Sequence, residues 1–358
     1  MKKLFLFFVA TIISNPAMAY NVYDNGNLSI DVDGEFAGYG LYNSSNANYD
    51  KTFRGVTYGN LGLDISKSYT FGNLGLYGSF KTAPYTQYSD DVNSLGEGYV
   101  YLEGNYGRFE LGNANNISRK LHISSPDVGI LSFDGQSGLD FIFAKSDVMF
   151  EASTAIIADN NKTKFSYVSP SIYGFQFAGS YIPDTGNDDL NNLKYGKLKD
   201  GFTTSLKYSY NNNDSFKVSV AYGEFNDTRM PLSVAGKRKE CSIGTMYYTR
   251  GIQLSASYKD IKEDDIIFDM SQDGYALNFG LAYEIGPLNL SLTQHKSKLA
   301  GDITNPRDDT VNITLLSSKL SVWKNIDFTL GLGRMAYKAE DESSDVGFIS
   351  TTGLLINF

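Results

Sequence analysis

The sequence predicts an all-β fold, a sixteen-stranded antiparallel barrel that crosses a membrane. Three observations lead to this fold class. Apolar residues recur at every second position through most of the chain, as they do in strands. Short turns and long polar segments alternate between these stretches, as in barrels with turns on one side of a membrane and loops on the other. Beyond residue 19 the apolar runs are too short for a spanning helix, which needs about 20 residues.

The first residues have the features of a secretory signal peptide. Two lysines precede an uncharged apolar run at 4–13, and residues 17–19 (Ala-Met-Ala) have the pattern of a cleavage site. We therefore expect residues 1–19 to be cleaved and residues 20–358 to form the barrel. An uncleaved anchor is the alternative, but no stop-transfer stretch follows.

The composition favours half-buried strands and excludes several functions. The chain has 26 Tyr and 23 Phe, but one Cys and two His. Tyrosine and phenylalanine suit strands, and tyrosine also suits a membrane interface. A single cysteine cannot form an intramolecular disulfide or a Cys-rich metal site, and no cofactor is expected. The formal net charge of −9 argues against a nucleic-acid partner.

Residues 275–285 show the alternation most clearly. Tyr275, Leu277, Phe279, Leu281 and Tyr283 fall on one face, with small or polar residues on the other. The two tyrosines bracket an apolar band about 19 Å high at a tilt near 45°, which fits a membrane. The same pattern recurs at 202–210, 216–222, 252–258 and 288–293. Because the second face of these stretches is polar, we expect a wet interior and no packed core.

The connections give the strand count. Turns rich in Gly, Asn, Asp or Pro occur at 71–73, 105–107, 169–171, 211–214, 250–251, 286–287 and 324–325. Long polar segments occur at 43–56, 84–95, 114–161, 183–199, 225–237, 261–271, 299–308 and 339–343. Seven turns and eight loops join sixteen strands. The last strand, 351–358, must pair with the first, 27–42, because strand edges cannot stay unpaired in lipid.

Four stretches resemble the Gram-negative general porin family. They are 28–34, 101–112 (Tyr-Leu-Glu-Gly-Asn-Tyr-Gly-Arg-Phe-Glu-Leu-Gly), 165–175 with its Tyr-Val-Ser-Pro and Gly-Phe pairs, and the C-terminal strand ending in Phe358. The resemblance implies an outer-membrane homotrimer in contact with lipid and lipopolysaccharide. Each barrel would be a passive channel for ions and small hydrophilic solutes, and not an enzyme. The third loop, here 114–161, would fold inward and narrow the pore.

In the family, acids on the inner loop face basic residues on the pore wall. The acidic candidates here are Asp127, Asp134 and Asp140, with Asp147 and Glu151 further along. Asp127 lies in Pro126-Asp127-Val128-Gly129, which resembles the family's Pro-Glu-Phe-Gly motif. Each of these acids could instead be a solvated loop charge.

The basic wall is where this sequence departs from the family. Glu35, Asn60 and Asn113 stand where the resemblance implies basic residues. Basic residues on expected inward faces lie elsewhere, at Lys81, Arg108, Lys164, Lys207, Lys217 and Lys259. Together with the negative net charge, this predicts a mild preference for cations.

Other interpretations stay open. A substrate-specific channel would use aromatic residues along its path, and Tyr77, Tyr99 and Tyr101 are candidates. A structural or adhesive surface barrel would also carry long loops. A hydrolase barrel is disfavoured, because His122 and His295 lie in no recognisable nucleophile motif. The acidic segment 183–191 allows calcium, although a solvated loop explains it as well.

Two features of the outward faces have more than one explanation. Arg334 interrupts an apolar outward face and could lie near the membrane interface, beyond a bulge, or against a neighbouring subunit. Gly34, Gly38 and Gly40 would give the first strand a flat outer patch suited to a subunit contact.

Overall fold

The computed structural model describes residues 20–45, 52–82, 93–126, 128–129, 151–159, 162–185, 198–212, 214–227, 236–263, 273–300, 308–338 and 345–358. These residues form one sheet of strands and one short helix, α2 (Ile117–Leu121). Within them, no helix is long and apolar enough to cross a membrane. The predicted signal peptide, 1–19, lies outside the described residues.

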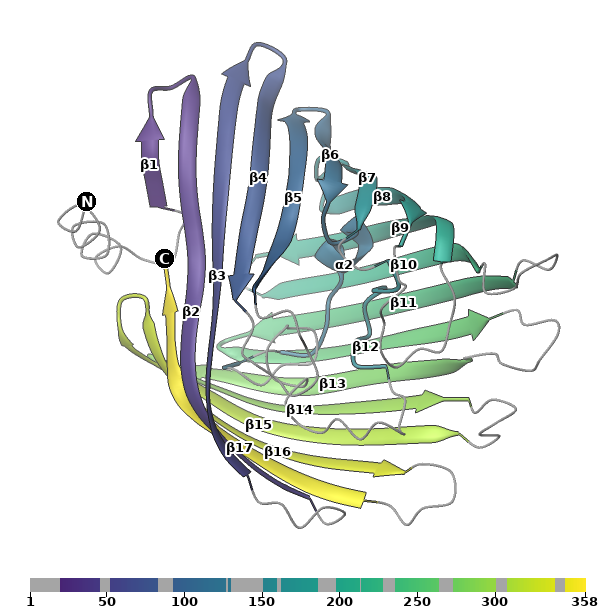
Figure 1. Cartoon of the computed structure of the whole chain (residues 1–358). Coiled ribbons are helices and arrows are strands. Elements are labelled where there is room, and N and C mark those ends of the chain that lie inside the picture. The colour runs from purple at the N-terminus through teal and green to yellow at the C-terminus, as the bar shows by residue number, and fades with distance from the viewer. Residues whose placement is uncertain are drawn as a thin grey trace.

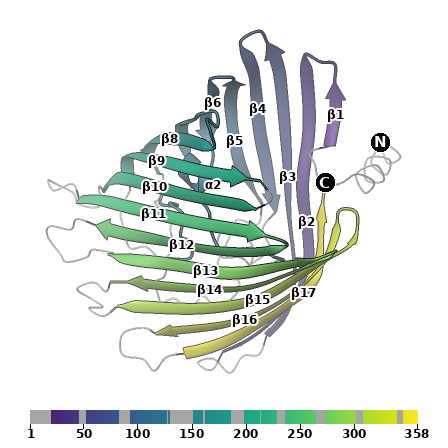
Figure 2. The same ribbon diagram turned by 180° about the vertical axis from the view of Figure 1, so that it is seen from behind.

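Sixteen strands form a closed antiparallel barrel (Figures 1 and 2). The first eight are β2 (Leu28–Ser45), β3 (Thr52–Tyr69), β4 (Gly72–Thr82), β5 (Asn93–Gly104), β6 (Gly107–Asn113), β7 (Thr163–Val168), β8 (Phe175–Asp184) and β9 (Leu198–Asn211). The others are β10 (Ser215–Asp227), β11 (Gly236–Thr249), β12 (Ile252–Glu263), β13 (Gly274–Ile285), β14 (Leu288–Leu299), β15 (Asp309–Trp323), β16 (Ile326–Lys338) and β17 (Asp345–Asn357).

The barrel closes as predicted, between its first and last strands. β17 pairs with β2 in an unbroken register from Gly347↔Ser45 to Asn357↔Glu35. Phe358 continues the contact, because its backbone exchanges hydrogen bonds of 2.7 and 2.9 Å with that of Gly34. Its ring lies over Gly34, where a Cβ would come within 2.6 Å of it. Gly34 is therefore covered by Phe358 and is not part of an open outer patch.

A seventeenth strand, β1 (Tyr20–Asp24), was not expected from the sequence. It pairs with β2 through Val32 to Ser29, just beyond the point where β17 ends. A tight turn joins the two strands, in which Gly26 has a φ of 81° and the Asp24 side chain accepts its backbone N–H at 2.7 Å. β1 thus pairs with the part of β2 that β17 leaves unpaired. The number of strands in the closed barrel stays at sixteen.

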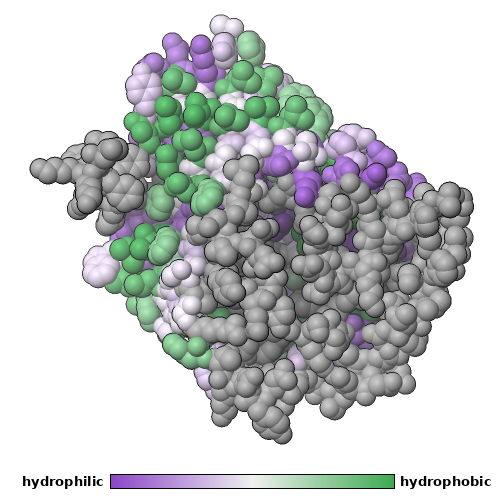
Figure 3. Space-filling model, in the orientation of Figure 1, coloured by the Kyte–Doolittle hydropathy of each residue, from purple (hydrophilic) through white to green (hydrophobic). Residues whose placement is uncertain are grey.

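Exposure along β13 shows which face is outward. Phe279 and Leu281 are 57% and 44% exposed, whereas Ala276 and Asn278 between the apolar positions are fully buried. The apolar face thus lies outside, as the membrane requires. On the side of the barrel seen in Figure 3, apolar side chains gather over β2 to β4 below a polar tip.

The predicted turn at 250–251 is also confirmed, since Arg250 and Gly251 have φ values of 48° and 83°.

The expectation of a wet interior with no packed core is wrong on one side of the barrel. There, β2, β15, β16 and β17 turn a buried apolar cluster inward, with each member less than a tenth exposed. We call this the inner apolar cluster; it comprises Ala37, Tyr39, Leu41, Val311, Ile313, Leu315, Met335, Tyr337, Ile349 and Leu355. Both faces of these strands are apolar, so the alternation that identified the other strands could not reveal their inner face.

Candidate functional site in the barrel lumen

The segment between β6 and β7 contacts the inner wall. Its helix α2 lies within the ring of strands in both views (Figures 1 and 2). Asn116 caps the helix by accepting the backbone N–H of Arg119 at 2.8 Å. Ile117 packs with Leu121 on the inward Ala178 of β8, and its N–H donates to Ser180 of the same strand at 3.1 Å.

The described residues after α2, 122–126 and 128–129, continue across the wall, and we call them the first limb. The N–H of Ile123 donates to Ser219 of β10 at 3.0 Å, and Asn278 of β13 donates to Ser124 at 3.1 Å. Contact with β11 is so close that a Cβ on Gly244 would lie 1.8 Å from the carbonyl oxygen of Ile123. Only glycine lets the backbone of this limb approach the strand so closely.

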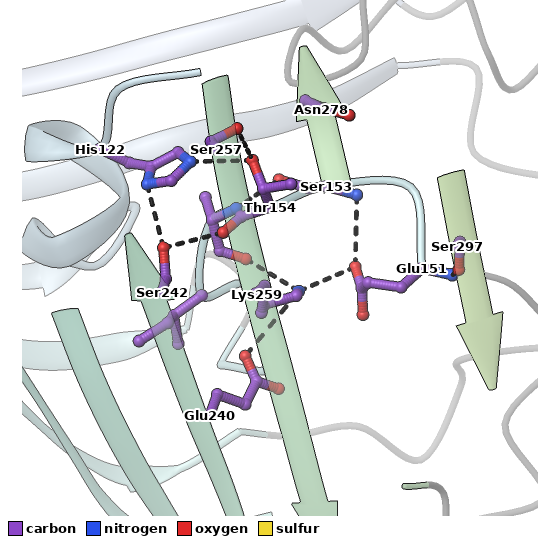
Figure 4. A network of polar contacts seen from close by, with 12 residues as sticks. His122, Glu151, Ser153, Thr154, Glu240, Ser242, Ser257, Lys259, Asn278 and Ser297 are labelled. Carbon is purple, nitrogen blue, oxygen red and sulfur yellow. Dashed lines mark hydrogen bonds and ion pairs between the residues drawn. The ribbon is translucent and has the colours of Figure 1, made fainter. Parts of the chain in front are cut away.

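The residues 151–159, which we call the second limb, contact the first limb and are hydrogen-bonded to the inner wall (Figure 4). Its Glu151 N–H donates to Ser297 of β14 at 2.8 Å. The carbonyl of Thr154 accepts from Ser242 of β11 at 2.9 Å. His122 joins the two limbs, because its ring nitrogens lie 2.9 Å from Thr154 Oγ1 and 3.1 Å from Ser242 Oγ. Since the Ser242 hydroxyl donates to a backbone carbonyl and is buried, this Ser–His contact is an anchor of the limb and does not resemble a nucleophile with its base.

Buried ion pairs reinforce the second limb. The ammonium of Lys259, fully buried on β12, lies 3.0 Å from Glu151 and 3.9 Å from Glu240, and donates to the Ala155 carbonyl at 2.9 Å (Figure 4). Arg238 of β11 pairs with Glu240 at 2.6 Å and with Glu263 at 2.7 Å. We call the five charged residues of these pairs the clasp; they are Glu151, Arg238, Glu240, Lys259 and Glu263. Glu151, which was a candidate pore acid, is thus neutralised against the wall.

A second buried pair holds the end of the same limb. Lys164 of β7 lies 3.0 Å from Asp159, and both side chains are 1% exposed. Asn116 donates to Asp159 at 2.6 Å and to the Ile156 carbonyl at 2.8 Å. Lys164 therefore faces inward as predicted, but its charge is compensated by the loop.

Two of the predicted wall residues lie side by side. Glu35 of β2 is directly opposite Asn60 of β3, which is opposite Lys81 of β4. All three face inward and are partly exposed. Tyr58 donates a hydrogen bond to the carboxylate of Glu35.

Arg108 faces the lumen among aromatic and acidic groups. It pairs with Glu103 and Glu110 at 2.9 Å each and lies 3.9 Å above the ring of Tyr101. Lys120 of α2 pairs with Glu110 at 2.6 Å and lies 4.7 Å above the ring of Tyr99. Tyr99 and Tyr101 are 8% and 6% exposed. The cations therefore cover these rings, which does not favour an aromatic path for a sugar.

The remaining wall candidates lie on different faces of the barrel. Lys207 of β9 and Lys217 of β10 face inward and are partly exposed, as predicted. Asn113 was placed on the wall wrongly. It alternates with the inward Gly112 and shares the outward face of β6 with Leu111. Its side-chain amide oxygen accepts a hydrogen bond of 2.6 Å from the Thr163 hydroxyl. The acidic candidates Asp127, Asp134 and Asp140 lie outside the described residues, as does Asp147.

Sequence reasoning missed three inward carboxylates on the first strands. Asp31 and Asp33 of β2 alternate with apolar outward residues, and Asp31 is directly opposite Asp64 of β3. Asp64 accepts a hydrogen bond from Tyr101 at 2.8 Å. With Glu35 they form what we call the acidic wall, and none of the four pairs with a cation in the described part of the chain. The odd-numbered positions 29–35 (Ser, Asp, Asp, Glu) carried this signal. Among the described residues, no group of His, Cys, Asp and Glu side chains could hold a metal ion.

Comparison with known proteins identifies the relatives of this chain. A sequence profile of Gram-negative porins matches residues 7–339. An uncharacterized protein of Rickettsia conorii is 24% identical, over 60% of this chain and 65% of that protein. The chain thus spans a little under two thirds of the length of the curated relatives it matches.

Two solved structures share the fold. OmpF of Salmonella typhi in complex with daunomycin superposes with a TM-score of 0.68 at 14% identity, over 95% of this chain and all of that one (100%). An anion-selective porin from Comamonas acidovorans superposes with a TM-score of 0.65 at 16% identity, over 92% and 100% of the two chains. At such identities the likeness is one of fold.

Proposed function

Because the chain belongs to the Gram-negative porin family and forms a closed barrel, it is an integral protein of the outer membrane, and we propose that it is a passive channel for ions and small hydrophilic solutes. One observation carries the proposal. The helix α2 and the two limbs are bonded to inward side chains of β7, β8 and β10 to β14, and the acidic wall lies on β2 and β3. This arrangement supports a loop on one side of the lumen and charged, partly exposed groups on another.

We propose that the whole segment 114–161 narrows the pore. The first limb reaches Gly129, where a Cβ would lie 3.4 Å from the Ser318 carbonyl of β15, and the second begins at Glu151 beside β14. Between these points the sequence carries Phe133, Leu139 and a Phe-Ile-Phe run at 141–143. The inner apolar cluster on β15 to β17 and β2 is the complementary surface, because apolar groups on a wet lumen wall would be costly.

We propose a mild preference for cations. The acidic wall carries four carboxylates with no cationic partner among the described residues, whereas Lys164, Arg238 and Lys259 are held in buried ion pairs. Lys81, Lys207 and Lys217 are inward, partly exposed cations that act against this preference. Unpaired carboxylates raise the local concentration of cations in a narrow lumen.

We propose that three copies associate through β2 and β3, with the cleaved chain, 20–358, as the subunit. The outward surface of β2 is flat at Gly38, where the nearest atom to an added Cβ would lie 3.9 Å away. Phe53 and Phe36 are 74% and 48% exposed beside it. An exposed aromatic patch of this kind suits a subunit contact or lipid.

Liposome swelling tests the channel. With residues 20–358 refolded into liposomes, we expect the swelling rate to fall smoothly as solute mass increases, without saturation by any one solute. Saturable entry of a single solute class would instead indicate a substrate-specific channel. Swelling no faster than in protein-free liposomes would indicate a structural or adhesive barrel. Release of fatty acid or peptide from supplied substrates would indicate an enzyme.

A further inference from the structure

Arg334 is a cation on the outward face of β16. It alternates with the inward Gly333 and Met335 and follows the outward Leu332, which is 56% exposed. Its register with β17 is unbroken, and the one irregularity between β15 and β16 lies at Ser321/Trp323. No bulge therefore turns Arg334 away from the membrane.

Beside Arg334 the outward face is hollowed. A groove of about 480 Å³ runs over β15, β16, β17 and the end of β2. Its lining includes the apolar Leu316, Leu332 and Phe348 and the polar Thr314, Arg334 and Ser350. The hollow arises because the small Thr314 and Ser350 lie on the two strands that flank β16, between larger apolar side chains.

Two outward cations near the loop ends of the strands have acidic partners, whereas Arg334 has none among the described residues. Lys298 pairs with Asp308 at 2.5 Å, and Lys262 with Asp273 at 3.0 Å. Within the described part of the chain, no carboxylate lies within ion-pair distance of Arg334. It also lies four residues before the last residue of β16, Lys338, and so roughly 10 Å deeper in the membrane at the usual strand rise and tilt.

We propose that this groove binds a phosphate-bearing lipid of the outer leaflet. The guanidinium of Arg334 would hold the phosphate through two parallel hydrogen bonds, which a lysine cannot reproduce. The hydroxyls of Thr314 and Ser350 are available at the groove to donate to the same group. The acyl chain would follow Leu316 and Phe348, which are 49% and 52% exposed. A phosphate would compensate the charge of an outward-facing arginine in lipid, and the bilayer is its nearest source.

Native mass spectrometry of the refolded chain tests this site. The probes are lipid A carrying its phosphates and the same lipid with its phosphates removed. We expect Arg334→Gln to lower the bound fraction of the phosphorylated probe about fivefold or more, and Arg334→Lys to lower it less. Ser350→Leu, which fills the groove and keeps the arginine, should lower it as well. Lys338→Gln, a cation at the strand end, should leave it within about twofold of the unsubstituted chain.

Two results overturn the proposal. One is equal binding of the phosphorylated probe by the unsubstituted chain, Arg334→Gln and Ser350→Leu. The other is a change of subunit number in Arg334→Gln with lipid binding unchanged, which assigns the groove to a neighbouring subunit. Heat-modifiable migration on a gel shows that each variant is folded, and Ser350→Leu alone decides the case if Arg334→Gln does not fold. Because none of these measurements uses ion flow, they are independent of the channel function.

Discussion

We expect Lys259→Met to lose about 3–5 kcal/mol of stability, the usual cost of removing one partner from a buried ion pair. Lys259 is fully buried and lies between Glu151 of the second limb and Glu240 of β11. Its removal leaves three clasp carboxylates and the single cation Arg238 in a dry environment. Methionine keeps the volume of the side chain, so the loss measures charge rather than a cavity. The midpoint of urea unfolding in detergent, followed by heat-modifiable migration, gives the change.

A matched control is available at the strand ends. Lys262 on the same strand pairs with Asp273 at 3.0 Å, but its side chain is 58% exposed. Lys262→Met should therefore shift stability by less than about 1 kcal/mol. Adding Glu151→Gln to Lys259→Met should recover part of the loss, because it removes one of the uncompensated carboxylates. Equal effects at Lys259 and Lys262 would contradict the clasp.

We expect Gly244→Ala to push the first limb into the lumen and to lower single-channel conductance. The new Cβ would lie 1.8 Å from the Ile123 carbonyl oxygen, so either the limb or β11 must move. The limb is held there by single hydrogen bonds to neighbouring strands, whereas β11 is paired on both sides, so the limb is the part that moves. Overpacking of this kind costs about 1–3 kcal/mol.

Gly78→Ala on the outward face of β4 is the control, because its Cβ would point away from the lumen and meet no atom within 4 Å. The two variants change glycine to alanine within a strand and differ in what the methyl group meets. Bilayer recordings compare their conductance with that of the unsubstituted chain. A reduced conductance in Gly78→Ala, or an unchanged one in Gly244→Ala, would show that the first limb does not border the conducting path.

The barrel could be predicted from the sequence because lipid imposes the pattern. Each residue such as Phe279 must face outward, and each neighbour such as Asn278 must then face the lumen. The alternating pattern did not predict the structure where contact with lipid does not determine the residue type. β1 lies beside β2 beyond the end of β17, and on β15 the inward Ile313 is as apolar as the outward Leu316.

The site was predicted less completely. Arg108, Lys207 and Lys217 were predicted on the inner wall from strand alternation, and Glu35 and Asn60 from the family resemblance. All five lie on inward faces of their strands. Their partners could not be predicted, because the contacts join distant parts of the chain. Lys259 and the carbonyl of Ala155, for example, are 104 residues apart in sequence. Only the fold shows that Lys164 and Lys259 are compensated by the loop, whereas the acidic wall has no cationic partner among the residues that the structure describes.

Single-channel recording tests the central claim most directly. Residues 20–358, refolded and added to a planar bilayer under a potassium chloride gradient, should give current steps in groups of three. The reversal potential should show a modest preference for potassium. A folded, heat-modifiable protein that conducts no current would contradict the channel, and a reversal potential favouring chloride would contradict the role given to the acidic wall.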